Sequence, residues 1–285
     1  MIAGIEFGGT KTVVAIGHAD GRLVEEFRYL TTNPDDTLRT AVEWIRLRGN
    51  PEAVGVGAFG PIILAQDKPE YGRMLATPKP GWEGFSLSAA LRDAFPDVRI
   101  VIETDVNAAA LAESRCGAAL GLDDVVYITI GTGIGAGMLS GGRLVHGALH
   151  PEFGHLKVPR FSGDDFAGVC PFHGACLEGL ASGPAIAARW GAEASTLPPG
   201  HKAWEMQAWY LAHGVLALAA ILAPSRVVIG GGVSQVESFH ALVGSTFRKL
   251  SAGYFTYGEG VDFIMPPSLG QQAGILGALL LVACG

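Results

Sequence analysis

The hydrophobic pattern of the first hundred residues predicts three short strands followed by alternating helices and strands. Apolar runs of period two are divided by turns at Gly8-Gly9 and Asp20-Gly21, which is typical of antiparallel hairpins. Apolar positions at helical spacing then alternate with buried apolar runs. In chain order, the expected elements are strands at 2–9 and within 10–30, a helix at 35–48, a strand at 53–61, a helix at 86–94 and a strand at 98–104.

A second copy of this architecture follows, although its sequence does not match the first. In chain order, its expected elements are a helix at 105–117, strands within 123–147, helices at 183–190 and 203–222, a strand at 225–233, a helix that starts near Gln235 and a closing helix at 271–284. Two such halves predict an α/β protein of two lobes. We expect residues 1–107, with 271–285 packing back on them, to form one lobe, and residues 108–270, with the loop 150–179, to form the other.

Composition limits the classes of protein that this chain can represent. Its 285 residues are 49% hydrophobic and 16% charged, so they can bury a substantial core. A net charge of −7 without a basic stripe argues against a nucleic-acid partner. The longest apolar stretches, near 214–223 and 273–284, are too short to cross a bilayer, and no signal-peptide pattern is seen. We therefore expect a cytoplasmic protein without a membrane partner, in which Cys116 and Cys284 are buried apolar side chains.

Three glycine turns are candidates for binding a nucleotide. GGTK at 8–11 offers backbone N–H groups, a hydroxyl and an ammonium to a phosphate, although it lacks the Walker A spacing and could be a simple hairpin turn. IGTGIGAG at 130–137 imitates the dinucleotide fingerprint, but the residues after it predict a hairpin instead of the required helix. A second phosphate-binding turn fits this stretch better than a dinucleotide fingerprint does. The glycines of IGGGV at 229–233 would let a planar ring lie against bare backbone.

Asp105 is the candidate base for phosphoryl transfer. The strand at 98–104 delivers it to the carboxyl edge of a sheet, where ligands bind in open α/β folds. A carboxylate there can accept the proton of a hydroxyl that attacks a γ-phosphate. The alternative is a structural role, because Asp is favoured as a helix N-cap and contributes about 1 kcal/mol there.

The loop 150–179 contains a candidate metal site. Cys170, His173 and Cys176 follow the pattern C-x2-H-x2-C, and His155 lies upstream. Four such ligands can bind zinc tetrahedrally and leave no open position for water, so we expect a structural site. The alternative is two buried thiols and a surface histidine.

Two acids flank these ligands, Glu152 and Glu178. Carboxylates accept hydrogen bonds from neighbouring hydroxyls and can fix the orientation of a sugar. Solvated loop acids are the alternative for either residue alone.

Together these motifs resemble the ROK family of sugar kinases. The order GGTK, G-x-F-G-P, T-D-V-N, IGTGIGAG, E-x-G-H, the Cys/His loop and IGGGV covers nearly the whole chain. T-P-K-P-G-W (77–82) and C-P-F-H-G-A-C-L-E-G (170–179) resemble the bacterial zinc-containing fructokinase branch. The resemblance implies a two-lobed actin/hexokinase-like (ribonuclease H-like) fold with its active site in the cleft between the lobes. It also implies a homodimeric kinase that converts D-fructose to fructose 6-phosphate with ATP, Mg²⁺ and a structural Zn²⁺.

The resemblance also assigns roles to individual residues. Asp105 is the implied catalytic base. The residues implied to bind the sugar are Thr104, Asp105, Gly60, Pro61, Glu152, His155 and Glu178. Those implied at the phosphates and the adenosine are Gly8, Gly9, Thr10, Lys11, Thr132, Gly133, Gly231 and Gly232. The implied zinc ligands are His155, Cys170, His173 and Cys176.

Two positions depart from the family pattern. Glu6 stands where many members have Asp, so any link to magnesium is expected to be longer or water-mediated. Thr104 stands where many glucose kinases have Asn, which weakens a glucose interpretation. The alternatives are a kinase for glucose, mannose or an N-acetyl hexosamine, and a sugar-binding regulator that has lost catalysis. Family repressors carry an N-terminal helix-turn-helix, and we expect none here because the first strand begins at residue 2.

Overall fold

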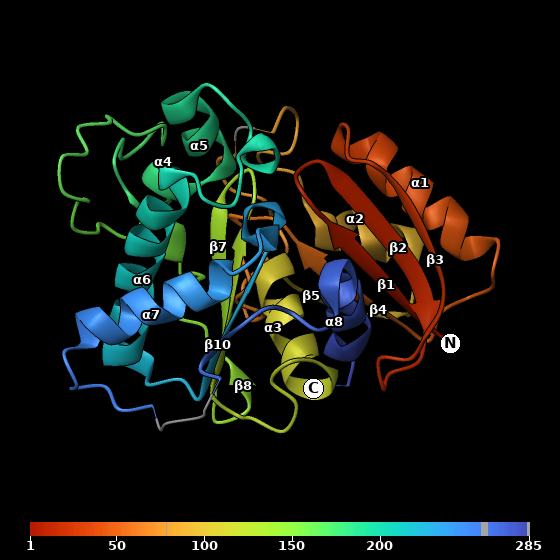
Figure 1. Ribbon diagram of the computed structural model, residues 1–285. Coiled ribbons are helices and arrows are strands. Elements are labelled where there is room, and N and C mark those ends of the chain that lie inside the picture. Colours follow the sequence, from red (N-terminus) through yellow and green to blue (C-terminus); the bar gives the residue numbers. More distant parts are fainter. Residues whose placement is uncertain (78, 258–261, 284–285) are drawn as a thin grey trace. The chain divides into compact units, whose positions relative to one another are not determined.

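The chain forms two compact α/β units (Figure 1), and the computed structural model describes its residues 1–77, 79–257 and 262–283. Unit 1 comprises Met1–Gly117, Leu144–Pro151 and Leu269–Gly285, and unit 2 comprises Ala118–Arg143 and Glu152–Ser268. The chain therefore passes between the units four times. Its first passage follows helix α3 (Asp105–Cys116), and the predicted boundary after residue 107 falls inside that helix.

Unit 1 is built on a mixed sheet with the strand order β3-β2-β1-β4-β5. The strands are β1 (Ile2–Phe7), β2 (Lys11–Gly17), β3 (Leu23–Leu30), β4 (Ala53–Ala58) and β5 (Arg99–Thr104). β2 runs antiparallel to β1, whereas β4 and β5 run parallel to it. The carboxyl ends of β1, β4 and β5 therefore lie at one edge, which is where ligands bind in open α/β sheets.

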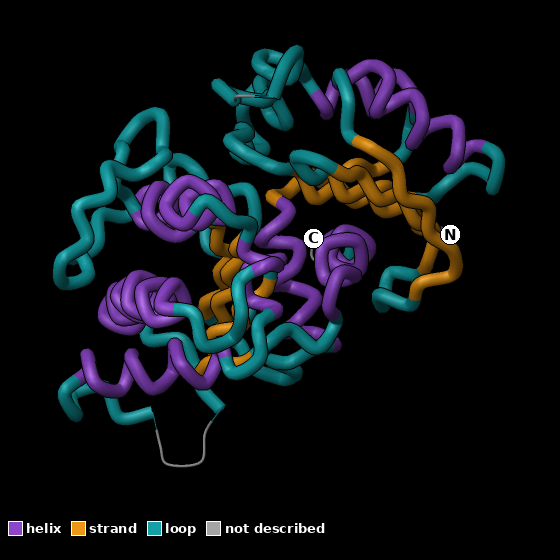
Figure 2. The backbone as a smooth tube through the Cα atoms, turned by 45° about the horizontal axis from the view of Figure 1, so that its top comes forward, coloured by secondary structure: helices purple, strands orange, loops and turns teal. Residues whose placement is uncertain are grey.

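Helices cover both faces of this sheet (Figure 1, Figure 2). They are α1 (Pro34–Arg46), α2 (Leu87–Ala94), α3 and α8 (Ala273–Leu281). Ala3, Ile5 and Phe7 pack in one apolar cluster with side chains of α1 and α2, whereas Ile2 packs with Leu279 of α8. Because both faces of β1 are covered, its sequence IAGIEF is almost continuously apolar.

Unit 2 repeats this topology with the strand order β10-β9-β6-β7-β8. Its strands are β6 (Val125–Ile130), β7 (Ile134–Ser140), β8 (Arg143–Leu144), β9 (Arg226–Gly230) and β10 (Ile264–Met265). Its α-helices are α4 (Leu177–Ala181), α5 (Gly183–Trp190), α6 (Lys202–Leu222) and α7 (Phe239–Ser251). β6 is antiparallel to β7 and parallel to β9, as β1 is to β2 and β4. The predicted duplication of architecture is confirmed.

Helix α6 is longer than the apolar stretch that its sequence suggested. Among the described residues it alone has the length and composition of a membrane span, with 21 residues. However, 56% of its apolar window is buried inside the protein, where α6 packs against α7 and α4. A helix buried in a protein core can have the same length and composition as a membrane span.

Two local expectations were wrong. The helix expected from Gln235 begins at Phe239, because the chain first forms a 3-10 turn, η3 (Gly232–Gln235), and then a left-handed residue, Ser238, with φ of 65°. Cys116 is exposed, since it ends α3 where that helix meets solvent, and its thiol donates to the Ala112 carbonyl at 3.3 Å. Cys284 lies outside the described residues.

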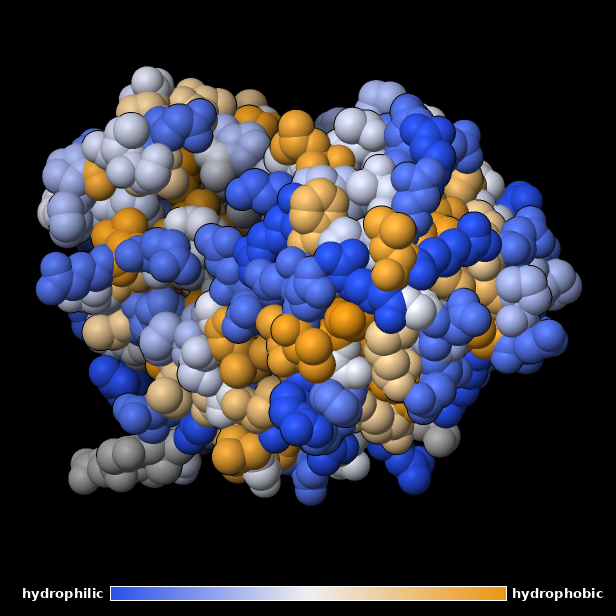
Figure 3. All heavy atoms as spheres, turned by 90° about the vertical axis from the view of Figure 1, so that its right-hand side faces the viewer, coloured by the Kyte–Doolittle hydropathy of each residue, from blue (hydrophilic) through white to orange (hydrophobic). Residues whose placement is uncertain are grey.

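Exposed apolar side chains are found on unit 1. Val24 and Leu30 of the edge strand β3 are 62% and 67% exposed, with Glu25, Glu26 and Arg28 between them. Charged residues on an edge strand discourage pairing with other strands. On the face shown in Figure 3, hydrophobic groups are likewise interrupted by hydrophilic ones.

Candidate active site

The first glycine turn joins β1 to β2 in unit 1. The N–H of Gly8 donates to the Lys11 carbonyl at 3.0 Å, which closes a tight hairpin with Gly9 and Thr10 at its tip. The turn is therefore a hairpin, and the same geometry leaves Gly9 and Thr10 as the residues that a phosphate would meet first. The N–H of Gly8, which was expected among the phosphate donors, is used inside the hairpin.

Asp105 is the first residue of α3, but it does not cap the helix. The N-cap is Thr104, whose hydroxyl accepts the N–H of Asn107 at 3.2 Å. One carboxylate oxygen of Asp105 accepts the adjacent Val106 N–H at 2.8 Å. The structural alternative for Asp105, an N-cap, is therefore wrong, because Thr104 supplies the cap. A negative side chain in the first turn also interacts favourably with the helix dipole.

Gly60 and Pro61 follow β4 at the same edge of the sheet. Their peptide bond is cis, and the Pro61 carbonyl accepts the Leu75 N–H at 2.8 Å. Unit 1 thus brings three of the predicted groups to one edge, after three parallel strands: the Gly8 turn, the Gly60-Pro61 pair and the Thr104-Asp105 pair.

Glu6, near the end of β1, lies close to this edge and has a raised pKa. Burial raises its pKa from the ordinary 4.5 to about 7, and the nearby Asp105 adds to the rise. Arg28 and the Ile275 backbone at the start of α8 act in the opposite direction. Its buried Oε2 has no hydrogen-bond partner among the described residues. A carboxylate oxygen in such a place is the kind of ligand that Mg²⁺ prefers.

A buried carboxylate next to the candidate base holds a histidine from a distant segment. Glu103 precedes Thr104, and its side chain is 5% exposed. One of its oxygens accepts the Thr104 N–H at 2.9 Å, and the other contacts Nε2 of His146 at 2.5 Å. His146 belongs to Leu144–Pro151, the short part of unit 1 that precedes Glu152.

The ion pair between Glu103 and His146 should make a pH-dependent contribution to the stability of the protein. The hydrogen bond to Glu103 raises the pKa of His146, whereas burial lowers the pKa of the neighbouring His150. Because the folded protein favours protonated His146, the pair stabilises it fully below the ordinary histidine pKa of about 6.5. That contribution is lost as the pH rises through the elevated pKa.

We expect His146→Gln to have a lower free energy of unfolding than the parent protein near pH 6. This difference in free energy should become smaller by about pH 9. The difference should stay within about 1 kcal/mol, because the His146 side chain is 42% exposed and solvent screens the pair. Urea unfolding at several pH values measures it. The exposed His18→Gln is the control, and parallel pH curves for His146→Gln and the parent protein would contradict the assignment.

The second glycine turn joins β6 to β7 in unit 2. The N–H of Gly131 donates to the Gly133 carbonyl at 2.9 Å, which leaves Thr132 at the tip. Glu178 braces this turn, since its Oε2 accepts the Ile134 N–H at 3.0 Å. Glu178 was expected only at the sugar, and the structure shows that one of its oxygens holds the second glycine turn in place.

The third glycine turn follows β9, which is parallel to β6, so the second and third turns lie at the same sheet edge. Gly231 has φ of 90° and lies against the backbone of Ile130, where a side chain would come within 2.5 Å of the Ile130 nitrogen. Only glycine fits this position. The turn then leads through Gly232 into η3.

The E-x-G-H run packs directly on β7. It forms the 3-10 turn η1 (Phe153–His155), and Gly154 lies so close to the Ile134 carbonyl group that a side chain there would clash. Partial burial raises the pKa of Glu152, and Glu178 adds to the rise while His155 opposes it. Glu152, His155 and Glu178 are thus near one another within unit 2, as the sequence motifs predict.

The four predicted metal ligands converge, with all donor atoms within 4.8 Å of one another. Nδ1 of His155 lies 3.3 Å from Nδ1 of His173 and 3.7 Å from each of the two cysteine sulfurs, and Nδ1 of His173 lies 3.8 Å from Sγ of Cys170. Tetrahedral zinc, with bonds of ~2.0–2.1 Å to nitrogen and ~2.3 Å to sulfur, would place its ligand atoms ~3.3 Å (N to N) and ~3.6 Å (N to S) apart. The cluster therefore fits zinc, and both histidines direct Nδ1 at it.

A buried ion pair holds the loop between these ligands. Arg189 of α5 donates to the Asp164 carboxylate at 2.9 Å, and their side chains are 7% and 4% exposed. Asp164 also accepts the hydroxyl of Tyr210 from α6, while Arg189 donates to the Leu180 carbonyl. These contacts join the loop that lies between the candidate metal ligands to α4, α5 and α6.

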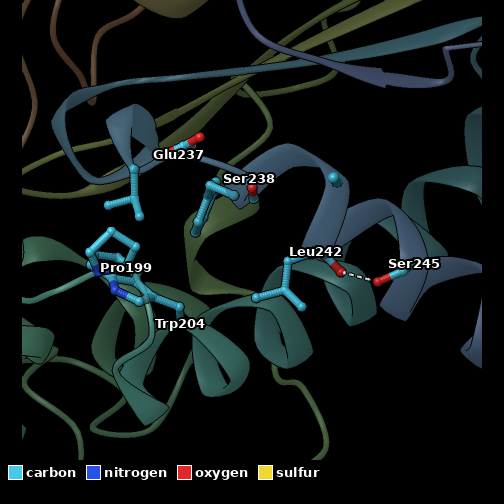
Figure 4. A pocket seen from close by; sticks show the side chains of 9 residues that line it. Pro199, Trp204, Glu237, Ser238, Leu242 and Ser245 are labelled. Atoms are coloured by element: carbon cyan, nitrogen blue, oxygen red, sulfur yellow. Dashed lines mark hydrogen bonds between the residues drawn. The ribbon is translucent and has the colours of Figure 1, made fainter.

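A pocket of about 320 Å³ lies in unit 2 between the starts of α6 and α7 (Figure 4). Trp204 and Phe239 form part of its wall, with Val236 and Leu242 beside them. One of its lining residues, Val236, comes four residues after Gly232, but none of the predicted glycines lines the pocket. Neither Trp204 nor Phe239 belongs to a motif, so sequence patterns gave no signal for this pocket.

Comparison with known proteins agrees with this geometry. A model of the ROK family matches residues 2–284. The fructokinase of Zymomonas mobilis subsp. mobilis is 41% identical over 289 residues, covering 97% of this chain and 94% of that protein. The fructokinase of Pediococcus pentosaceus is 37% identical, with coverage of 99% and 97%. A ROK family glucokinase from Streptomyces griseus, solved with glucose and AMPPNP, has a TM-score of 0.79 at 27% identity, covering 100% of this chain and 99% of that one.

These similarities confirm the predicted actin/hexokinase-like fold and the family that the motifs resemble. The match extends from the first strand to the closing helix, so it includes every motif on which the resemblance depended. This chain belongs to the ROK family.

Proposed function

We propose that the protein is an ATP-dependent fructokinase that transfers a phosphoryl group to the 6-hydroxyl of D-fructose. The observation that carries the proposal is the placement of Asp105, whose capping role is filled by Thr104, at the sheet edge that also carries the first glycine turn. The relatives favour fructose, because the fructokinases are 41% and 37% identical whereas the glucokinase is 27% identical.

In this mechanism Asp105 accepts the proton of the attacking hydroxyl. The carboxylate must lie within hydrogen-bond reach of that hydroxyl, and a base so placed contributes about 10²–10⁴-fold to the rate. Thr104, Gly60 and Pro61 lie at the same sheet edge and would contact the sugar. Glu152 and Glu178 would accept hydrogen bonds from its other hydroxyls, and His155 would form a hydrogen bond with one of them.

The glycine turns would bind the nucleotide. Gly9, Thr10 and Lys11 of the first turn, together with Thr132 and Gly133 of the second, would donate to phosphate oxygens, while Gly8 shapes the first hairpin. Gly231 and Gly232 would approach the adenosine. Mg²⁺, when bound, neutralises charge on the phosphates. The carboxylate of Glu6 offers the oxygen ligands that this ion prefers.

Zinc would have a structural role at His155, Cys170, His173 and Cys176. Four protein donors complete a tetrahedral site and leave no position for a reacting water. Because His155 directs Nδ1 at the metal site, its other ring nitrogen, Nε2, is the one that would meet a sugar hydroxyl. The metal would thereby fix the orientation of the ring.

We further propose that the protein forms a homodimer and is located in the cytoplasm.

A panel of hexoses tests the assignment. With MgATP we expect ADP release to show the highest kcat/KM for fructose, and lower values for glucose, mannose and N-acetylglucosamine. A preference for one of the other sugars would overturn the choice of fructose and leave the kinase. Absence of sugar-dependent ADP release would favour the regulator that has lost catalysis.

A further inference from the structure

The motif T-P-K-P-G-W contains a lysine, Lys79, that no role has yet explained. Its described residues 79–82 are held in place by Trp82, which is fully buried and packs edge-to-face on Phe59 and Phe7, with ring centroids 4.9 Å and 5.7 Å away. The indole N–H also donates to the Thr32 carbonyl at 2.8 Å. Because Phe7 ends β1, this anchor fixes the segment next to the first glycine turn.

From this position Lys79 reaches the turn itself. Its ammonium donates to the Gly9 carbonyl at 2.7 Å and to the Thr31 carbonyl at 2.9 Å. An ammonium has three N–H donors, and these two carbonyls account for two of them. The lysine therefore ties the tip of the turn to the residue that follows β3.

Thr31 holds the carbonyls on either side of Gly9. Its hydroxyl donates to the Gly8 carbonyl at 2.7 Å, and its backbone N–H donates to the Thr10 carbonyl at 2.9 Å. Thr31 is 6% exposed, and its hydroxyl also lies 2.8 Å from that of Thr12. Three consecutive carbonyls, of Gly8, Gly9 and Thr10, are thus held by Thr31 and Lys79.

This arrangement decides where the amide groups of the turn point. A trans peptide unit is planar, and its C=O and the following N–H point in opposite directions. When the carbonyls of Gly8, Gly9 and Thr10 are held, the N–H groups of Gly9, Thr10 and Lys11 are directed away from the two clasping residues. Consecutive N–H groups fixed in this way form a site for an anion, and their cost of reorganisation is removed in advance.

We propose that Lys79 is a positioning residue for the transferred phosphate, acting with Thr31 as a clasp on the Gly8–Thr10 turn. The clasp orients the N–H groups of the turn, and the ammonium adds positive charge beside them. This inference rests on the proposed function, because it deepens the role of the same nucleotide-binding turn. It also gives the T-P-K-P-G-W motif a purpose: the tryptophan anchors the segment so that the lysine can reach the turn.

Substitution of Lys79 tests the clasp. We expect Lys79→Met to raise the KM for ATP and lower kcat by roughly 10-fold or more, since a hydrogen bond from a charged donor is lost. The KM for the sugar and the unfolding midpoint should stay close to the parent values. Lys79→Arg should recover much of the loss, because a guanidinium can donate to both carbonyls. Lys68→Met, an exposed lysine in the same loop-rich region, is the matched control.

Other outcomes overturn the proposal. An unchanged kcat and KM for ATP in Lys79→Met would show that the clasp has no effect on the phosphate. A drop in stability with equal changes in the KM for ATP and the KM for the sugar would indicate that Lys79 only stabilises the fold. If Lys79→Met does not fold, Thr31→Val removes the hydroxyl donor and Thr31→Ser retains it. The valine variant must then show the selective ATP defect, and the serine variant must not.

The test remains valid if the proposed function fails. Should the parent protein phosphorylate another sugar, the same comparison applies with that sugar. Should it phosphorylate none, calorimetric binding of MgADP replaces kinetics. Weaker binding to Lys79→Met than to Lys68→Met would support the clasp, and equal binding would refute it.

Discussion

Asp105→Asn is expected to lower kcat by about 10²–10⁴-fold while the protein still binds its sugar. The asparagine amide preserves the size of the side chain but cannot accept the hydroxyl proton as a carboxylate does. Folding should be unaffected, because Thr104 provides the N-cap of α3. ADP release and calorimetric sugar binding, measured on the same preparation, separate loss of turnover from loss of affinity.

Asp35→Asn is the matched control for this variant. Asp35 is also an acid in the first turn of a helix, α1, but it is exposed. We expect this control to keep its activity. If Asp105→Asn released ADP at the parent rate, the base would have to be assigned to another residue.

Cys176→Ser is expected to abolish zinc binding and to lower both the free energy of unfolding and the affinity for sugar. Cys176 is fully buried in the cluster, and its sulfur also accepts the Gly179 N–H as the N-cap of α4. Serine is a favoured N-cap, so the helix cap survives and the loss reports on the metal. Structural zinc contributes on the order of 10 kcal/mol of apparent folding free energy in small domains. Because each kcal/mol shifts the midpoint by about 2–4 °C in large domains, we expect a drop of roughly 10 °C or more.

Cys116→Ser is the control, because this exposed thiol lies outside the cluster. Metal analysis of the parent protein should find one zinc per chain, and Cys116→Ser should retain it. Chelation should lower sugar affinity together with the unfolding midpoint, since His155 is shared by the metal site and the proposed sugar site. A parent protein without zinc, or sugar affinity that survives chelation, would refute the structural zinc.

Much of the fold could be predicted because its signals are local. The apolar run of β1 and the glycines that follow it are neighbours in the chain, and so are the strand and helix that deliver Asp105. The candidate metal ligands could also be predicted, since Cys170, His173 and Cys176 lie within seven residues. The family resemblance depended on the order of such local motifs, and the family match confirms it.

Other features could not be predicted, because they depend on how side chains meet after folding. The exposure of Cys116 depends on where α3 ends, and the start of α7 depends on the left-handed Ser238. Sequence alone allowed Asp105 to be an N-cap or a base. The hydrogen bond from the Asn107 N–H to the Thr104 hydroxyl, which only the folded structure shows, excludes the N-cap role.

The sequence by itself determined most of the order of strands and helices, the three glycine turns, the candidate metal donors and the family, because periodicity and spacing are properties of neighbouring residues. The tertiary structure decided which groups hold those features in place. Lys79 reaches Gly9 across 70 positions of the chain, and His146 reaches Glu103 across 43. No local pattern specifies such pairs, because hydrogen bonds and ion pairs require only proximity in space, and packing of the sheet and its helices creates that proximity.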